Sequence, residues 1–243
     1  MWGIVPAAGI GSRIQPLAFS KELLPLGGPS EGAAERPRAV SEYLVERMVL
    51  GGATRICMVI APGKSDLVAY HGDGKHGAHM SYVVQPRPLG LCDALFRALP
   101  VIAPGERILV GLPDTVWFPA DALRLLDDGG LSFLCFPVGR PEHFDAVVAD
   151  DEGRVEAIDV KASAPRSRWI WGAFKLSREV FDELYALWCA RGREDQYFGT
   201  LVNAWLSAGG RATAVRAGEQ YVDVGTLDGY REAMRVLAER SGR

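Results

Sequence analysis

Hydrophobic residues along the first half of the chain fall into two alternating patterns. Short continuous apolar runs have the length and β-branched content of buried strands. Between them, apolar residues recur at helical spacing, as Val40, Leu44 and Met48 do. The expected strands cover 2–8, 55–61, 81–85, 107–112 and 131–138, and the expected helices cover 39–50, 64–70, 90–99 and 119–127. This order predicts a doubly wound, mainly parallel, Rossmann-like α/β sheet.

The pattern changes near Gly139, and the second half is richer in strands. We expect strands at 146–149, 155–160, 168–175, 212–215 and 220–222, with a hairpin turn at 151–153 and helices at 179–190, 197–206 and 227–239. We interpret this half as a β-rich, antiparallel insertion laid on the same sheet. The chain is therefore predicted to form a single domain over 1–243, with halves 1–138 and 139–243 and no appended domain.

Two polar stretches interrupt these elements. Residues 27–38 are rich in Gly, Pro, Glu and Arg and predict an exposed loop. Residues 71–79 contain three histidines, which raises the alternative of a metal site. Glycine and alanine separate these histidines, and no acid or cysteine follows at a ligand spacing, so a polar loop before a strand is favoured.

Composition and charge exclude several classes of protein. The 243 residues carry a net charge of −3, so no basic footprint predicts a nucleic-acid partner. No apolar stretch approaches the roughly 20 residues of a membrane helix, and no charged segment precedes the first apolar run as in a signal peptide. The four cysteines are scattered without a C-x-x-C pair. These features together predict a cytoplasmic protein.

The first strand leads into a loop suited to a polyphosphate. Ala8 is followed by Gly9-Ile10-Gly11-Ser12-Arg13, where small residues let backbone N–H groups surround an anion. Arg13 adds a rigid fork of donors, and Lys21 adds a mobile positive charge. The dinucleotide fingerprint fails because Ile14 stands where a third glycine is needed. The P-loop fails because Lys21 is followed by Glu22.

Polar residues also follow other expected strands at their carboxyl ends, where ligands of such sheets bind. Gln85 follows the third strand, Asp114 follows the fourth, and Asp223 follows a short strand near the end of the chain. Asp114 and Asp223 are either turn or helix caps or a pair of Mg²⁺ ligands, and we favour the pair because Mg²⁺ takes one or two carboxylates beside phosphate oxygens.

The string G-x-G-S-R, then S-K-E-L-L-P at 20–25, resembles the signature of the nucleotide-sugar pyrophosphorylases. This sugar-1-phosphate nucleotidylyltransferase family includes the glucose-1-phosphate thymidylyltransferases and uridylyltransferases. The resemblance implies a GT-A-like nucleotidyltransferase fold and a Mg²⁺-dependent reaction. A nucleoside triphosphate, dTTP or UTP, would join a sugar 1-phosphate and release pyrophosphate. It also admits a homo-oligomer, since relatives often form dimers or tetramers.

The resemblance also implies roles for individual residues. Residues 85–94 look like the family's Q-x-x-x-x-G-L-x-x-A segment, in which the Gln and Gly contact the base. The catalytic set is Arg13, Lys21 and Asp114, and the metal ligands are Asp114 and Asp223. Nucleotide contacts are expected from Ala8, Gly9, Gly11, Ser12, Arg13, Gln85 and Gly90. Acceptor contacts are expected from Lys161, Trp171 and Gly172, with Arg191 or Arg193 as a further phosphate contact.

Several residues depart from the family pattern. Pro113 and Thr115 flank Asp114 where the family has L-G-D-N, and Tyr221 replaces a Trp before Asp223. Val160 stands before Lys161 where the family has a Glu that contacts sugar hydroxyls. The acceptor is therefore open: a sugar 1-phosphate, or a non-sugar phosphate or phosphonate. A nucleotide-sugar sensor without catalysis is the other alternative.

Overall fold

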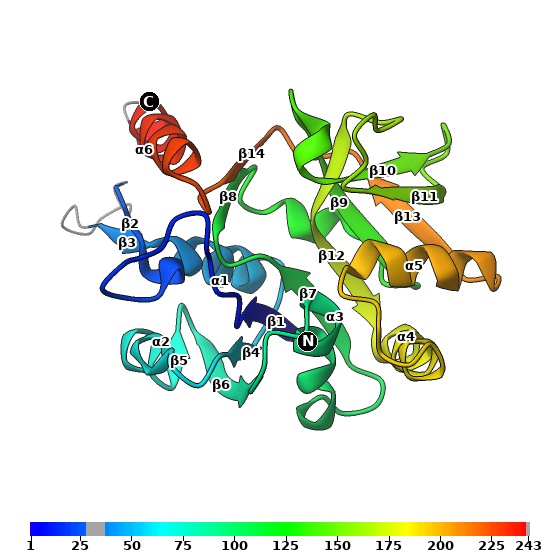
Figure 1. Cartoon of the computed structure of the whole chain (residues 1–243), viewed down its shortest axis with the longest axis horizontal. Helices are drawn as coiled ribbons and strands as arrows, with labels where there is room; N and C mark the ends of the chain where they lie inside the picture. Colours follow the sequence, from blue (N-terminus) through cyan, green and yellow to red (C-terminus); the bar gives the residue numbers. More distant parts are fainter. Residues whose placement is uncertain (28–36, 242–243) are drawn as a thin grey trace.

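A mixed sheet of ten strands forms the centre of the molecule in the computed structural model, which describes residues 1–27 and 37–241 (Figure 1). Four strands of the first half run parallel in the order β7-β1-β4-β6, and β5 pairs antiparallel with the edge of β6. Their bounds are Trp2–Ala7 (β1), Arg55–Ile60 (β4), Gly74–Lys75 (β5), Ala78–Val84 (β6) and Arg107–Gly111 (β7). The predicted parallel, doubly wound sheet is confirmed.

The strands of the second half extend this same sheet. β12 pairs antiparallel with β7, and β10 and β11 follow beyond it, while β9 pairs with both β12 and β13. Their bounds are Leu131–Pro137 (β9), Asp145–Ala149 (β10), Val155–Val160 (β11), Trp169–Ser177 (β12) and Ala212–Val215 (β13). The β-rich second half is therefore built onto the parallel strands, as expected; the single-domain organisation stays a prediction.

Both faces of the parallel strands are buried, which explains their continuous apolar runs. In β1, Trp2 and Ile4 pack into a core with α3, α4 and α5. Val5 and Ala7 point to the opposite face, into a core with α1 and α2. The helices span Val40–Leu50 (α1), Ser65–His71 (α2), Leu91–Arg97 (α3), Arg178–Ala190 (α4), Phe198–Ser207 (α5) and Leu227–Ser241 (α6).

A third, smaller core joins the end of the chain to its beginning. Strands β8 (Thr115–Phe118) and β14 (Gln220–Asp223) pair antiparallel, and α6 packs beside them against Leu24 and Leu26. Figure 1 shows α6 and β2 (Pro25–Leu26) on the same side of the molecule. This arrangement brings the last helix next to the segment that follows the glycine-rich loop.

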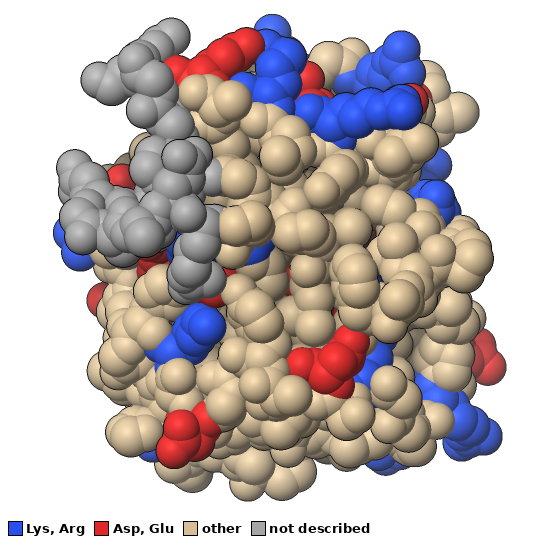
Figure 2. Space-filling model, turned by 90° about the vertical axis from the view of Figure 1, so that its left-hand side faces the viewer, with Lys and Arg blue, Asp and Glu red and all other residues tan. Residues whose placement is uncertain are grey.

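Charges on the face that carries α6 are mixed in sign. Figure 2 shows Lys and Arg side chains beside acidic ones along the upper edge of that face, above a largely uncharged centre. On α6, Arg235 pairs with Glu232 and Glu239, and Arg240 pairs with Glu219. Positive charge is therefore balanced locally there. Among the described residues, no helix is long and apolar enough to cross a bilayer.

In the region after β7, one predicted helix is wrong and one strand was missed. The expected helix at 119–127 is only a short 3₁₀ turn, η3 (Ala122–Leu125). Strand β8 was not predicted, although Thr115, Val116 and Trp117 have the β-branched and aromatic character of a strand. Within the described part of the chain it pairs with β14, more than a hundred residues away, and that pairing cannot be predicted from the local sequence.

The two expected polar loops also need correction. Of the stretch 27–38, residues 28–36 lie outside the described part, but Arg38 is buried in β3 (Arg38–Ala39) and pairs with Glu42 and Glu46. The stretch 71–79 is not a loop throughout. It contains the end of α2, and then a tight hairpin of β5 and β6. His71 is buried, with its Nε2 atom 2.9 Å from Ser41 Oγ.

The buried His71 makes stability depend on pH. Burial lowers the pKa of His71 from 6.5 to about 4, so the native protein keeps it neutral while the unfolded chain binds a proton below pH 6.5. Its contribution is complete above pH 6.5 and is lost as the pH falls toward 4, by up to about 1.4 kcal/mol per pH unit. Urea unfolding of wild type and His71→Gln from pH 7 to 4.5 measures this. We expect the wild-type curve to fall more steeply; parallel curves would contradict the assignment.

Candidate active site

The glycine-rich loop begins where β1 ends and turns back over Lys21. Gly11 has φ of 71°, a backbone conformation that residues with a side chain rarely adopt. A Cβ atom there would lie 2.6 Å from Lys21 Cδ. Its carbonyl accepts from the N–H groups of Ile14 and Gln15. Glycine at this position therefore lets Lys21 lie directly against the loop.

Two contacts from the start of α2 hold this loop, and neither was predicted. Lys64 Nζ donates to the carbonyls of Ala7 and Gly9, at 2.7 and 2.8 Å, and to both carboxylate oxygens of Glu22. Asp66 accepts from the backbone N–H and the hydroxyl of Ser20, both at 2.7 Å. The only sequence signal was position, since both residues follow the carboxyl end of β4. Lys64 therefore holds the loop by its carbonyls, and Asp66 holds Ser20 further along the chain.

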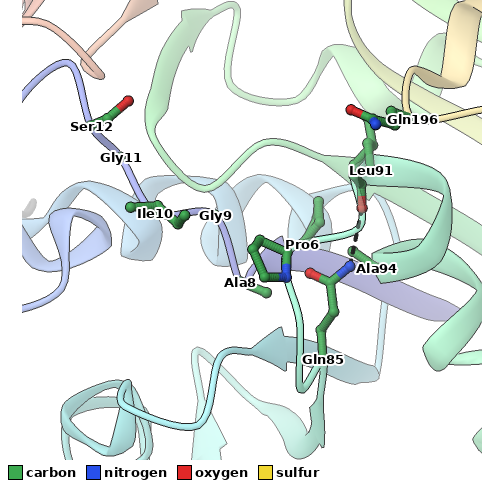
Figure 3. A pocket seen from close by; sticks show the side chains of 12 residues that line it. Pro6, Ala8, Gly9, Ile10, Gly11, Ser12, Gln85, Leu91, Ala94 and Gln196 are labelled. Carbon is green, nitrogen blue, oxygen red and sulfur yellow. Dashed lines mark hydrogen bonds between the residues drawn. The ribbon is translucent and has the colours of Figure 1, made fainter.

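A cavity of about 370 Å³ lies between the loop and the start of α3 (Figure 3). The structure brings together six of the seven predicted nucleotide contacts here, and it adds Gln196, which the sequence did not indicate. The lining residues are Pro6, Ala8, Gly9, Ile10, Gly11, Ser12, Gln85, Pro88, Gly90, Leu91, Ala94 and Gln196. The seventh, Arg13, lines the neighbouring cavity.

Gln85 and Gly90 form the far wall of this cavity. Gln85 is buried, and its amide nitrogen donates to the Gly90 carbonyl at 3.1 Å and to Asp93 Oδ2 at 2.8 Å. Gly90 has φ of 94°, and a Cβ there would collide with the backbone of Gln196 at 2.7 Å. A glycine is therefore needed where α3 starts against Gln196.

Two ion pairs stand at the rim beside the loop. Lys21 Nζ lies 2.5 Å from Asp114 Oδ2, and Arg13 Nη1 lies 3.1 Å from Asp223 Oδ2. A Cβ atom on Gly225 would lie within 3.3 Å of Asp114, Asp223 and Arg13 together. Pairing of β8 with β14 causes this, because it sets Asp223 opposite Thr115, the neighbour of Asp114.

The charges at the rim raise the pKa of two neighbouring groups, Lys21 and Tyr221. Burial alone would lower the pKa of Lys21, but the carboxylates of Asp114, Glu22 and Asp223 together outweigh it, so the pKa is raised and the ammonium stays charged. Burial raises the pKa of Tyr221 well above its ordinary value, and the negative charges of Asp223 and Asp114 raise it further. Tyr221 therefore stays a neutral phenol at this rim.

A second cavity of about 390 Å³ opens on the other side of Arg13. It is lined by Arg13, Leu112, Asp114, Thr115, His143, Phe144, Lys161 and Asp223. Lys161 has φ of 46°, and its Nζ atom donates to the His143 carbonyl at 2.7 Å. Lys161 therefore lines the same cavity as the two carboxylates and Arg13, and its contact with an acceptor phosphate stays a prediction.

Other predicted acceptor residues lie elsewhere. Trp171 is packed in the core against Phe133 and Phe174, and it lines neither cavity, nor does Gly172. Arg191 pairs with Asp195, and Arg193 lies over the ring of Trp188. Binding of an acceptor by these four residues stays a prediction that their side-chain positions do not favour.

Asp145 is a further residue that the sequence did not indicate. It stands opposite Val160 in the β10–β11 pair, next to Lys161, and its Oδ1 atom is buried without a hydrogen-bond partner among the described residues. Burial raises the pKa of Asp145, while the Lys161 charge opposes this. The Asp145 carboxyl group therefore lies beside Val160, the position at which the family has a Glu.

The two rim carboxylates suit a divalent cation that arrives with phosphate. Asp114 and Asp223 offer oxygen ligands of the kind Mg²⁺ prefers, and two carboxylates suffice when phosphate oxygens complete the shell. The described residues contain no cluster of three or more acidic, His or Cys side chains suited to hold a metal alone. The residues therefore fit a cation shared with a ligand better than a protein-only site.

Comparisons with known proteins find similarity to nucleotidyltransferases. A model of the nucleotidyl transferase family matches residues 2–240. The chain is 28% identical over 196 residues to the low-salt glycan biosynthesis nucleotidyltransferase Agl11 of Haloferax volcanii, across 77% of this chain and 52% of that protein. It is 27% identical over 246 residues to a glucose-1-phosphate thymidylyltransferase of Xanthomonas campestris pv. campestris, across 97% and 80%. The chain spans 52% to 58% of the first curated relatives it matches.

Solved structures share the fold. One is a Bacillus anthracis protein provisionally described as a glucose-1-phosphate thymidylyltransferase, with a TM-score of 0.82 and 23% identity across 98% of this chain and 95% of that one. Another is a UTP-bound UGPase from Acinetobacter baumannii, with a TM-score of 0.75 and 18% identity across 97% and 92%. At these identities the similarity establishes the fold alone.

The ion pair between Lys64 and the buried Glu22 gives a test of the loop clamp, the set of contacts by which Lys64 holds the glycine-rich loop. Lys64→Met leaves the Glu22 carboxylate buried without a cation, so we expect the unfolding free energy to fall by about 3 kcal/mol in denaturant titrations. Lys64→Met combined with Glu22→Gln removes the stranded charge and should recover part of this loss. A single variant as stable as wild type would show that the clamp contributes nothing.

Proposed function

This chain belongs to the nucleotidyl transferase family, and on that premise we propose that it joins a nucleoside triphosphate to a sugar 1-phosphate, giving an NDP-sugar and pyrophosphate. The observation that carries the proposal is the pair of ion pairs at the rim, Lys21 with Asp114 and Arg13 with Asp223, set between two cavities. One cavity suits a nucleoside, and the other holds Lys161 for an acceptor phosphate.

The main obstacle to this reaction is repulsion between two phosphorylated reactants. A phosphate oxygen of the acceptor attacks the α-phosphorus, a new P–O bond forms, and the bond to the β-phosphate oxygen breaks with release of pyrophosphate. Two unit charges 4 Å apart repel by about 4 kcal/mol at an effective dielectric constant near 20. Arg13 and Lys21 would offset this on the nucleotide side and Lys161 on the acceptor side. Positioning and charge stabilisation then suffice without a protein nucleophile.

The ion pairs also explain how the carboxylates become available. When phosphate oxygens reach Arg13 and Lys21, these cations gain new partners, and Asp114 and Asp223 are released from theirs. We propose that the two carboxylates then hold Mg²⁺ together with the phosphates. The cation would neutralise charge on the triphosphate during transfer.

For the base, the cavity favours uracil or thymine, hence UTP or dTTP. The amide nitrogen of Gln85 is already engaged by Gly90 and Asp93, so its carbonyl oxygen remains to accept a hydrogen bond. The N3–H group of uracil or thymine is a donor that matches it. Figure 3 gives the arrangement of Gln85 opposite Ala8 and Gly9 of the loop.

For the acceptor, we favour a sugar 1-phosphate, and a non-sugar phosphate or phosphonate is the alternative. Val160 contacts Gly199 on α5 and offers no polar group, whereas the Asp145 carboxyl lies beside it. If Asp145 turns toward the cavity it can bind a sugar hydroxyl. If it does not, a non-sugar phosphate or phosphonate is the better acceptor. If no acceptor reacts at all, the protein is a nucleotide-sugar sensor.

We extend the proposal to the whole chain as one nucleotidyltransferase domain, with 1–138 binding the nucleotide and 139–243 binding the acceptor. The continuous sheet that joins the two halves supports this division. A cytoplasmic location, where both reactants would be made, and a homo-oligomer belong to the same proposal.

A matrix of substrates tests the reaction directly. Each of dTTP, UTP, CTP, ATP and GTP is combined with sugar 1-phosphates, phosphocholine and phosphonates in the presence of Mg²⁺, and pyrophosphate release is measured. We expect release with UTP or dTTP and a sugar 1-phosphate, and none without the divalent cation. Binding of nucleotide without release from any pair would identify the sensor instead.

Single substitutions test the rim charges. Lys21→Ala and Asp114→Ala should each lower kcat/KM at least about 100-fold, because each removes charge stabilisation at the reacting phosphates. Arg55→Ala removes an exposed ion pair with Glu106 away from the rim and serves as the control, with unchanged turnover. Circular dichroism should report an intact fold in all three. Unimpaired pyrophosphate release in either rim variant would refute the assignment.

A further inference from the structure

We propose that Asp93 sets the nucleobase preference of this protein by fixing which end of the Gln85 amide faces the cavity. The inference rests on the proposed nucleotide site and adds a positioning residue to it. Asp93 lies on α3 and contacts Gln85 from behind, on the side away from the glycine-rich loop. It is absent from the lining of the nucleotide cavity, so it acts through Gln85.

The side chain of Gln85 has two ends that differ in hydrogen bonding, and the surroundings accept only one orientation. Its amide nitrogen donates to the Gly90 carbonyl at 3.1 Å and to Asp93 Oδ2 at 2.8 Å. Both partners are acceptors without a hydrogen to give. Turning the amide over would place its carbonyl oxygen against two other oxygens in a buried site. The amide oxygen is therefore held on the cavity side, as Figure 3 shows.

Asp93 is itself held in place by an ion pair. Arg97, one turn later on α3, donates to both of its carboxylate oxygens at 3.2 and 3.3 Å. The Asp93 side chain is only 7% exposed, so solvent competes little for it. A carboxylate also gives a stronger and more strictly one-sided contact than a neutral side chain, because it cannot donate.

A fixed acceptor distinguishes bases by the edge they present. Uracil and thymine carry a hydrogen on N3 and can donate to the Gln85 oxygen. Cytosine carries a lone pair on N3, which would face that oxygen and repel it. A free amide could turn to donate to cytosine instead. Asp93 removes that freedom, so we expect it to impose a preference for bases with an N3–H group.

Binding of UMP and CMP to the whole protein tests this without requiring turnover. Calorimetric titration should give wild type a clear preference for UMP. Asp93→Asn keeps the shape but can donate as well as accept, so only the Gly90 carbonyl still requires the amide nitrogen and Gln85 turns over more readily. We expect the ratio of the two affinities to fall by about tenfold, as the loss of one well-formed hydrogen bond predicts. Pyrophosphate release with UTP and CTP should show the same narrowing.

The matched control is Asp182→Asn, which breaks a similar Arg–Asp pair on α4 without contact to Gln85. Its ratio should equal that of wild type. A ratio unchanged in a folded Asp93→Asn protein, or equal binding of UMP and CMP by wild type, would overturn the inference. A protein that prefers UMP in this Asp93-dependent way yet releases no pyrophosphate would sustain the inference and sink the proposed reaction. Binding of neither nucleotide would overturn both.

Discussion

For the proposed reaction, electrostatic repulsion between two phosphorylated ligands is the constraint on which this site depends. The chain meets it by pairing each rim cation with a carboxylate, so that Lys21 is held by Asp114 and Arg13 by Asp223. The pairs keep long, flexible side chains in position before a ligand arrives. They also place cations for a triphosphate and carboxylates for a divalent cation at the same rim. The raised pKa of Lys21 follows from this arrangement, since Asp114 and the other nearby carboxylates together outweigh the cost of burial.

The fold serves that constraint by joining distant segments at one edge. Parallel strands deliver the glycine-rich loop, Gln85 and Asp114 to their carboxyl ends. The small β8–β14 sheet then brings Asp223 from the far end of the chain to the same rim. Contacts behind the surface, from Lys64 to the loop carbonyls and from Asp93 to the Gln85 amide, hold groups that line the cavity beside the loop.

The sequence predicted the parallel sheet and the convergence of its strand ends because those features have local patterns. Apolar runs, glycines and the polar residue after each strand are visible along the chain. Strand β8 and the clamp by Lys64 are not, since each depends on a partner far away in sequence. Trp171 is a related case: its motif does not show that its side chain packs in the core against Phe133 of β9, and its contact with an acceptor stays a prediction.

The most direct test of the account compares uridine, UMP and UTP as ligands by calorimetry, in Mg²⁺ and at two salt concentrations. If the rim charges hold the phosphates, affinity should rise with each added phosphate, and salt should weaken UTP binding while leaving uridine binding nearly unchanged. If UTP binds no more tightly than uridine at low salt, the charges at this rim do not serve a triphosphate, and the account is wrong.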